Sequence, residues 1–171
     1  MNQVYLSKPT VELEQEYLSF YQDWVNSGEK YVPFVIRQDP NTLIQFLLDS
    51  AQGLNIPAQF VPHTTYWLVR DEDKSILGAV NIRHQLNEKL LNIGGHIGYG
   101  ICSSERRKGY ATKMLALSLE KARELGIQKV LVTCDYNNLA SKKTIFNNGG
   151  VPDTDYVEES GNIVNRFWIE L

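Results

Sequence analysis

The amino-acid sequence predicts one α/β domain with a mixed, mostly antiparallel sheet flanked by helices. Segments with helical periodicity alternate with β-branched and aromatic runs along the 171 residues, and this alternation is typical of α/β domains. Two pairs of these runs are separated by short turns, which indicates antiparallel hairpins. No internal repeat, low-complexity tract or linker interrupts the chain, so residues 1–171 are predicted to form a single domain.

The N-terminal part of the chain is predicted to be mainly helical. A short strand at 4–6 precedes a helix over 11–26, in which aromatic residues recur at intervals of three and four. A loop over 28–39 leads to a second helix over 41–52, whose apolar residues share one face. Another proline-containing loop follows over 53–63.

The middle of the chain is predicted to be rich in strands. Residues 65–69 and 76–83 flank a charged turn at 71–74 and form the first predicted hairpin. A polar connector follows over 85–91. The apolar, glycine-containing run 96–102 then predicts a further strand.

The C-terminal part is predicted to alternate helices and strands. A helix over 111–125 is followed by a β-branched, apolar run at 129–134 that indicates a buried strand. The next helix covers 138–148, because asparagines suited to capping precede it and glycines follow it. The strands 154–158 and 162–169 form the second predicted hairpin.

The segment Arg106-Arg107-Lys108-Gly109-Tyr110-Ala111 joins a predicted strand to a predicted helix. A helix start exposes unpaired N–H groups and carries about half a positive charge. Gly109 allows a ligand to approach the backbone closely, Ala111 keeps that approach clear, and the three cations add positive charge. This combination predicts a cradle for a pyrophosphate group. The competing interpretation is an ordinary basic helix start.

The same segment resembles the acetyl-CoA loop of the GNAT N-acetyltransferase superfamily. In that loop, two residues separate Gln or Arg from a Gly, and one further residue separates this Gly from Gly or Ala; Arg106, Gly109 and Ala111 fill the pattern. The resemblance covers about 66–171, and the sequence at 94–100 is similar to a branch of predicted acetyltransferases. It implies a GNAT-like fold, in which the central strands of the sheet splay apart beside the loop and its helix.

The resemblance also implies which residues bind acetyl-CoA. Pantetheine is expected along the strand before the loop, and the pyrophosphate on the backbone N–H groups of the loop. Arg106 and Lys108 would screen phosphate charge, or would belong to a solvated basic patch. The expected binding residues are Tyr99, Gly100, Ile101, Arg106, Arg107, Lys108, Gly109, Tyr110, Ala111, Thr112, Asn138 and Ser141.

The implied reaction moves the acetyl group of acetyl-CoA to a primary amine by direct attack. An amine with a pKa near 10.4 is mostly protonated at pH 7, and its neutral form is disfavoured by about 4.6 kcal/mol. A general base or a water chain must therefore take a proton. His96 is the preferred base, although it could only pack and hydrogen-bond; His84 is the second candidate, ahead of Glu88 and His63.

The sequence departs from the family at the general acid. Many members have a tyrosine seven residues after the asparagine that opens the helix following the fifth strand. Here that position is Ile145 when counted from Asn138, or Thr144 when counted from Asn137. Tyr99, a water, or unassisted departure of the thiolate remain, because a thiol pKa near 8.5 makes the thiolate a tolerable leaving group. We therefore expect Tyr99 to be a helper at best.

Composition excludes several classes of function. The net charge of −3 disfavours a general nucleic-acid binder, and no apolar run approaches the roughly 20 residues of a membrane span. The first twenty residues lack the apolar block of a secretory signal, so we expect a cytoplasmic protein. Cys102 and Cys134 are expected to be reduced and internal. No CxxC, HExxH or histidine cluster is present, so no metal site is predicted.

The acceptor amine, a small molecule or a peptide or protein amine, cannot be identified from the sequence. Residues 1–64 and 85–95 are expected to shape its pocket, whereas 65–171 form the sheet and the acetyl-CoA-binding core. A homodimer is a further expectation. The alternative function is a non-catalytic acyl-CoA-binding sensor. A nucleotide-binding enzyme is disfavoured because GxxxxGK[ST] is missing and Gly98 and Gly100 do not complete GxGxxG.

Overall fold

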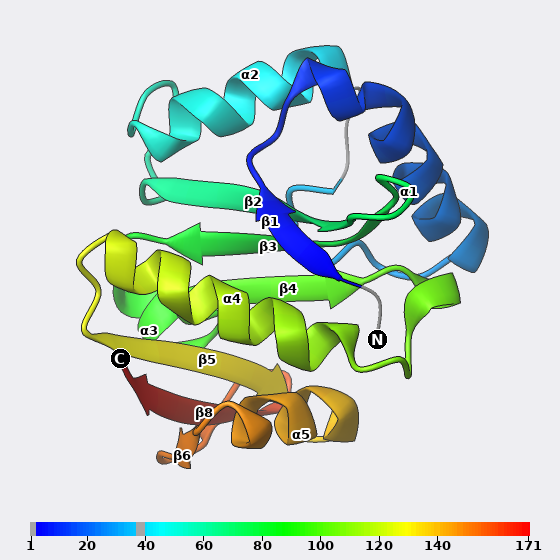
Figure 1. Cartoon of the computed structure of the whole chain (residues 1–171). Helices are drawn as coiled ribbons and strands as arrows, with labels where there is room; N and C mark the ends of the chain where they lie inside the picture. Colours follow the sequence, from blue (N-terminus) through cyan, green and yellow to red (C-terminus); the bar gives the residue numbers. More distant parts are fainter. Residues whose placement is uncertain (1–2, 37–39) are drawn as a thin grey trace.

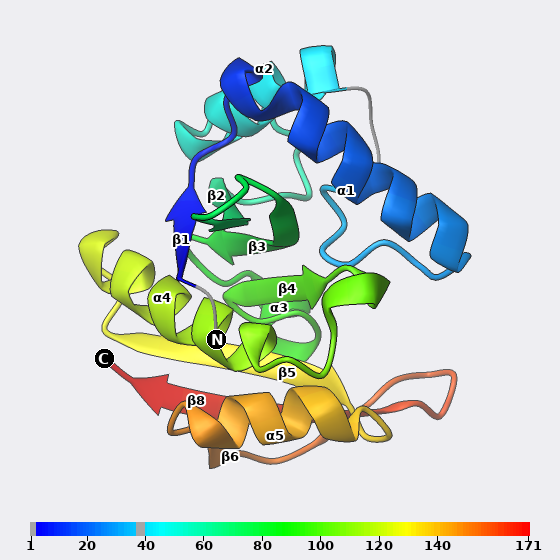
Figure 2. The ribbon, with the colours of Figure 1, turned by 45° about the vertical axis from the view of Figure 1, so that its right-hand side comes forward.

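Two sheets lie edge to edge, and helices pack against them (Figure 1; Figure 2). The structure, a computed structural model, describes residues 3–36 and 40–171. In the first sheet the strand order is β1-β2-β3-β4, and all neighbouring strands are antiparallel. Its members are β1 (Val4–Ser7), β2 (His63–Arg70), β3 (Ile76–Arg83) and β4 (Ile97–Ile101).

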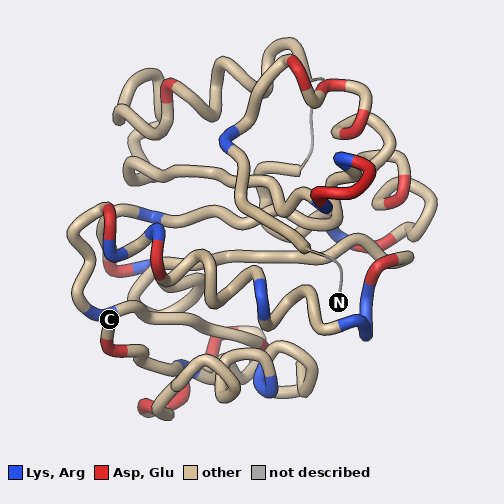
Figure 3. Tube along the Cα trace, viewed as in Figure 1, with Lys and Arg blue, Asp and Glu red and all other residues tan. Residues whose placement is uncertain are grey.

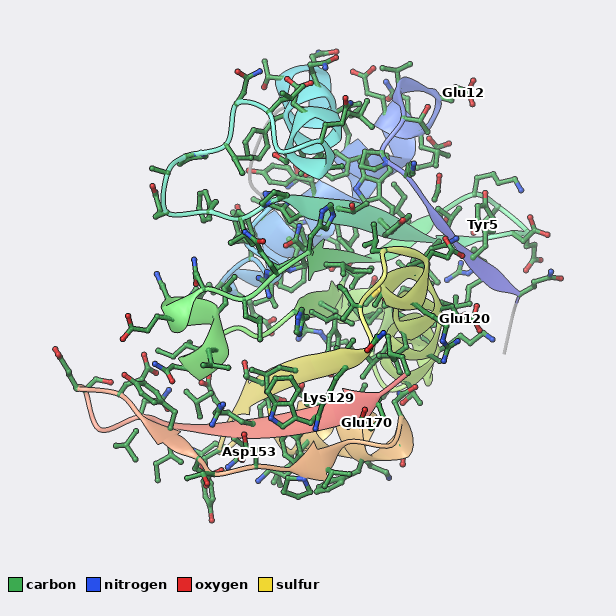
Figure 4. All side chains as sticks on the ribbon, turned by 90° about the vertical axis from the view of Figure 1, so that its left-hand side faces the viewer. Tyr5, Glu12, Glu120, Lys129, Asp153 and Glu170 are labelled. Atoms are coloured by element: carbon green, nitrogen blue, oxygen red, sulfur yellow. The ribbon has the colours of Figure 1, made fainter. Side chains whose placement is uncertain are left out.

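The second sheet has the order β5-β8-β6, and β7 also pairs with β8. Its members are β5 (Lys129–Asp135), β6 (Val151–Pro152), β7 (Tyr156–Val157) and β8 (Ile163–Glu170). β5 and β8 are antiparallel over seven residue pairs, beginning with Lys129 opposite Glu170. These two side chains lie side by side in Figure 4 and form an ion pair with an Nζ–Oε1 distance of 3.0 Å.

Helices pack on opposite faces of the first sheet. The helices of the described residues are α1 (Glu14–Ser27), preceded by the 3-10 turn η1 (Val11–Leu13), α2 (Pro40–Ala51), α3 (Glu88–Asn92), α4 (Tyr110–Glu124), preceded by the 3-10 turn η2 (Ser103–Glu105), and α5 (Leu139–Asn147). α1, α2 and α4 pack on the first sheet, whereas α5 contacts α4 and β5. α1 and α2 share one core with the sheet, in which Tyr17 stacks on Trp67 at 4.9 Å between ring centroids. α4 supplies Met114 and Leu115, both fully buried, to the core on the other face.

β4 and β5 are neighbours that stay together only at one end. They run in the same direction in Figure 1. The backbone N–H of His96 donates to the carbonyl of Leu131 at 2.7 Å, and Leu131 N–H donates to His96 Nδ1 at 2.9 Å. No strand pairing between β4 and β5 follows within the described residues, so the two sheets splay apart toward the C-terminal end of β4. The expected GNAT-like fold with splayed central strands is confirmed.

Most expected elements are present, with local differences. The connector expected over 85–91 contains α3, because Asn87 caps a short helix by accepting a hydrogen bond from Leu90 N–H at 2.9 Å. β2 begins at His63, inside the segment expected to be a loop. The short strand β6 carries no sequence signal of its own. The loop expected over 28–39 includes 37–39, which lie outside the described residues.

Two expected absences can be compared with the described part of the chain. None of its helices is long and apolar enough to cross a membrane. No group of three or more His, Cys, Asp or Glu side chains is placed there to hold a metal ion. Cys102 and Cys134 are both buried free thiols.

Candidate active site

The loop between β4 and α4 presents a row of free backbone N–H groups. Arg107 and Gly109 both have left-handed backbones, with φ angles of 64° and 84°. Such turns aim successive N–H groups to one side and create an anion-binding concavity. Within the described residues, the N–H groups of 107–112 have no hydrogen-bond acceptor, and the first that has one is Lys113, which donates to Gly109 O at 3.2 Å.

Two of the three cations of this loop are paired with acids. Figure 3 marks the positions of the charged residues along the Cα trace. Arg106 Nη1 and Nη2 donate hydrogen bonds of 2.9 and 2.5 Å to the carboxylate of Glu29, and Arg106 Nε donates to Ile101 O at 2.9 Å. Lys108 pairs with Glu105 at 3.0 Å. Arg106 therefore fixes the loop to the end of α1, and the first charge available to a ligand is that of Arg107.

A cavity of about 510 Å³ opens where β4 and β5 separate. Its walls are the end of β4, the loop with the start of α4, and one face of α5. The lining residues are Tyr99, Gly100, Ile101, Glu105, Arg106, Arg107, Gly109, Tyr110, Ala111, Thr112, Asn138, Ala140, Ser141, Lys143, Thr144 and Asn147. All residues expected to contact the cofactor are in this set except Lys108.

Tyr99 connects the two sides of the cavity. Its hydroxyl lies 2.9 Å from Ser141 Oγ, and burial raises its pKa to about 12. The phenol is therefore protonated at neutral pH and can donate a hydrogen bond. Asn138 caps α5 by accepting from Ser141 N–H at 3.0 Å, so the cap fixes the residue that meets Tyr99.

α5 contributes residues that the sequence did not indicate as cofactor-binding. Lys143, Thr144 and Asn147 line the cavity together with Ala140. These positions recur at intervals of three and four, which places them on one helical face. That periodicity, counted from the cap at Asn138, is the signal that could have found them. Ile145, at the position of the family's tyrosine, is fully buried in the core.

His96 lies outside the lining of the 510 Å³ cavity. Its Nδ1 accepts the hydrogen bond from Leu131 N–H, and its ring lies 6.4 Å from that of Trp168. Burial, with a smaller contribution from Arg83, lowers its pKa to about 4. These contacts favour a role in joining β4 to β5, and the structure does not bring His96 to Tyr99.

The other histidine candidates for the base are also held in structural contacts, whereas Glu88 is exposed. His84 Nε2 lies 2.8 Å from Thr64 Oγ1, and burial lowers its pKa. His63 is 1% exposed and bonded to Asn81 at 2.8 Å. Glu88 is an exposed residue in the first turn of α3. Burial raises the pKa of the Cys134 thiol, as expected of a core cysteine.

The cavity has the features that a CoA ester requires. The N–H row and Arg107 face one wall, Lys143 adds a cation from the other, and the β4 edge beyond His96 has no strand partner among the described residues. A pyrophosphate needs such donors. A pantetheine chain carries amides that can pair with an open strand edge.

Comparisons with known proteins agree with this geometry. The family model described as acetyltransferase (GNAT) domain matches residues 4–151. No curated protein matches the sequence. Among solved structures, the microcin C7 self-immunity acetyltransferase MccE, in complex with acetyl-CoA and AMP, has a TM-score of 0.70 at 16% identity; the alignment covers 100% of this chain and 94% of that one.

Two further solved structures show the same fold. RimL, a ribosomal L7/L12 alpha-N-protein acetyltransferase in complex with coenzyme A, has a TM-score of 0.70 at 15% identity, covering 100% of this chain and 96% of that chain. A protein from Vibrio cholerae described as a ribosomal-protein-serine acetyltransferase has a TM-score of 0.65 at 16% identity, with 100% and 95% covered. At such identities the likeness concerns the fold.

Proposed function

The chain belongs to the GNAT acetyltransferase family, and we propose that it moves the acetyl group of acetyl-CoA to a primary amine by direct attack. The observation that carries this proposal is the row of free N–H groups at 107–112, which faces the cavity between the splayed strands. Two of the similar structures are complexes with acetyl-CoA or coenzyme A, which supports the choice of ligand.

Different residues of the cavity would bind different parts of acetyl-CoA. The N–H groups of 107–112 would hold the pyrophosphate, with the charge of Arg107 and the hydroxyl of Thr112 beside them. The backbone of β4 at Tyr99 and Ile101 would pair with pantetheine. Lys143 would meet further phosphate charge from α5.

The reaction requires little covalent chemistry from the protein. The thioester is already activated, so positioning the amine beside it supplies much of the rate. The proton of the amine must leave through a base or a water chain, because its neutral form is disfavoured by about 4.6 kcal/mol at pH 7. Tyr99, protonated and on the cavity wall, can donate a hydrogen bond to the departing sulfur.

Cofactor binding is tested with a charge placed in the cradle. Gly109→Asp introduces a carboxylate beside the expected phosphates, and we expect acetyl-CoA binding at least tenfold weaker, or about 1.4 kcal/mol. Gly109→Asn is the matched control, since asparagine has nearly the same size and also tolerates a left-handed backbone. Gly126→Asp places the same charge at the far end of α4, at a φ of 81°.

Calorimetric titration of the folded variants measures the effect. Equal affinities for Gly109→Asp and Gly109→Asn would remove the phosphates from this loop. Turnover is measured as CoA release with small amines, antibiotics, peptides and protein N-termini as acceptors. Tight acetyl-CoA binding without transfer to any of them would favour the alternative, a non-catalytic acyl-CoA-binding sensor.

A further inference from the structure

A second, smaller cavity lies beside β4, on the sheet face that carries α1 and α2. Its volume is about 250 Å³, and its walls come from β2, β3, α3 and the segments around 34 and 59–61. Phe34 and Phe60 stack at 5.3 Å between ring centroids, and Leu90 and Ile93 line the same cavity. The cavity therefore offers an aromatic and apolar surface of small-molecule size.

Arg83 is a charged group of this cavity, and none of the described residues is an acidic partner for it. Its Nη1 donates to the carbonyl of Gly94 at 2.9 Å and to that of Gly95 at 3.4 Å. No carboxylate of the described residues lies within ion-pair distance of its guanidinium. Its Nε is buried without a partner, and burial lowers its pKa to about 10.

The surroundings of Arg83 would attract an anion. Of the described residues, no Asp or Glu lines the cavity, whereas Lys89 adds a second cation. The chain as a whole carries a net charge of −3. The positive charge around this cavity is therefore a local feature, and it favours anionic ligands. A desolvated cation is costly unless it is paired, and a guanidinium pairs best with a planar carboxylate.

The position of Arg83 relates this cavity to the cofactor. A side-chain carbon built on Gly98 would lie 3.0 Å from Arg83 Nη2, so the glycine is what lets the guanidinium rest on β4. The next residue of β4, Tyr99, lines the acetyl-CoA cavity. An acceptor held by Arg83 would thus lie across β4 from the Tyr99 side chain, because successive side chains of a strand point to opposite faces.

We propose that the acceptor is a small amine that also carries a carboxylate, an amino-acid-like molecule with an apolar or aromatic body, and that Arg83 binds its carboxylate. The proposal rests on the proposed acetyl transfer. The competing explanation is structural: Arg83 would only tie the loop at 94–95 to β3 through its two carbonyl contacts.

Matched acceptors separate these explanations. Phenylalanine, phenylalaninamide and phenethylamine share the aromatic body and the amine, and only the first has a carboxylate. We expect the wild-type protein to prefer phenylalanine over both by at least tenfold in kcat/KM. Arg83→Gln, which keeps a donor for the carbonyl of Gly94, should abolish the preference, mainly through KM, while acetyl-CoA affinity stays unchanged. Arg123→Gln, at an exposed arginine of α4, is the control.

The outcomes are distinct. Equal use of the three amines by the wild-type protein, or an equal loss for all three in Arg83→Gln, would overturn the carboxylate site and leave the acetyl transfer standing. If no amine is acetylated, binding of N-acetylphenylalanine and of its amide is measured by calorimetry with CoA present. Arg83-dependent preference for the acid supports the site although the proposed transfer fails; absence of that preference overturns the site.

Discussion

At the scale of single residues, a residue of a ligand-binding motif can stabilise the fold instead of contacting the ligand. Arg106 fills the first position of the acetyl-CoA loop pattern, yet its guanidinium is engaged by Glu29 and Ile101. The free N–H groups of the loop, and not this side chain, are what face the cavity. Arg106 therefore shapes the cradle by holding its first residue in place.

Tyr99 is expected to assist without being essential. Tyr99→Phe removes the hydroxyl that meets Ser141 and keeps the ring that packs in the core. We predict a loss of turnover below tenfold and an unchanged affinity for acetyl-CoA, because a thiolate is a tolerable leaving group. Steady-state kinetics with calorimetric titration is the measurement. A loss beyond about 10³-fold in a folded, binding-competent variant would make Tyr99 the general acid.

His96 can be tested in the same way. A general base contributes about 10²-fold or more, so a catalytic His96 would lose that much turnover in His96→Gln, together with the acid limb of the pH–rate profile. Its bond to Leu131 and its position outside the cavity lining lead us to expect less than tenfold and a persistent acid limb. Near-complete loss with unchanged thermal stability would contradict this and restore His96 as the base.

At the scale of elements, the site depends on how closely the N-terminal loop packs on β4. A side-chain carbon on Gly100 would lie only 2.0 Å from the carbonyl oxygen of Val32 and 3.2 Å from Trp24. Glycine at this position therefore lets the segment after α1 cover the strand that borders the cofactor cavity. The segment after α1 packs closely on β4 at this glycine. The ion pair between Arg106 and Glu29 is a second contact between the two halves of the chain.

Gly100→Ala tests this contact. The added methyl group must displace backbone, and overpacking of this kind costs typically 1–3 kcal/mol, so we expect a free energy of unfolding lower by about 2 kcal/mol or more. Gly161→Ala is the control, since no atom lies within 4 Å of the added carbon and only its φ of 87° opposes it. Urea denaturation compares the two. A smaller effect at Gly100 than at Gly161 would show that the loop can move away freely.

At the scale of the whole molecule, two buried histidines link stability to pH. Burial lowers the pKa of His63 and that of His96 to about 4, from an ordinary value near 6.5. The unfolded chain therefore binds more protons than the folded chain between these values. The contribution of the two neutral histidines to the free energy of unfolding is fully present above pH 6.5 and is lost as the pH falls toward 4.

This linkage predicts how much unfolding free energy the protein loses in acid. Each histidine should cost about 2 kcal/mol of unfolding free energy at pH 5 relative to pH 7.5. Denaturant titrations at both values measure the difference for the wild-type protein and for His96→Gln. The variant should show a fall that is smaller by about that amount, whatever its stability at pH 7.5. Parallel pH dependences would mean that His96 titrates normally in the folded protein.

Assembly of the molecule stays a prediction. Leu139, Val151 and Val157 are more than half exposed, on α5 and on two short strands of the second sheet. Apolar side chains alone do not identify a partner. Sedimentation analysis would test the expected homodimer.

The sequence by itself determined the order of most elements and the fold class, and it singled out the loop that we propose binds the cofactor. These features depend on local signals. Periodicity separates helices from strands, asparagine and glycine mark helix ends, and Arg106 to Ala111 form a contiguous motif. The short helix α3 and the two-residue strand β6 were missed, because elements of this length carry too few residues for periodicity to emerge.

Only the tertiary structure decided which side chains meet. It paired Arg106 with Glu29, 77 residues away in sequence, and it bonded His96 Nδ1 to the backbone of β5. It also placed Arg83 beside an aromatic cavity, with no acidic partner among the described residues. The physical reason is that a side chain's charge state and reach depend on burial and on partners distant in sequence, which no local pattern records.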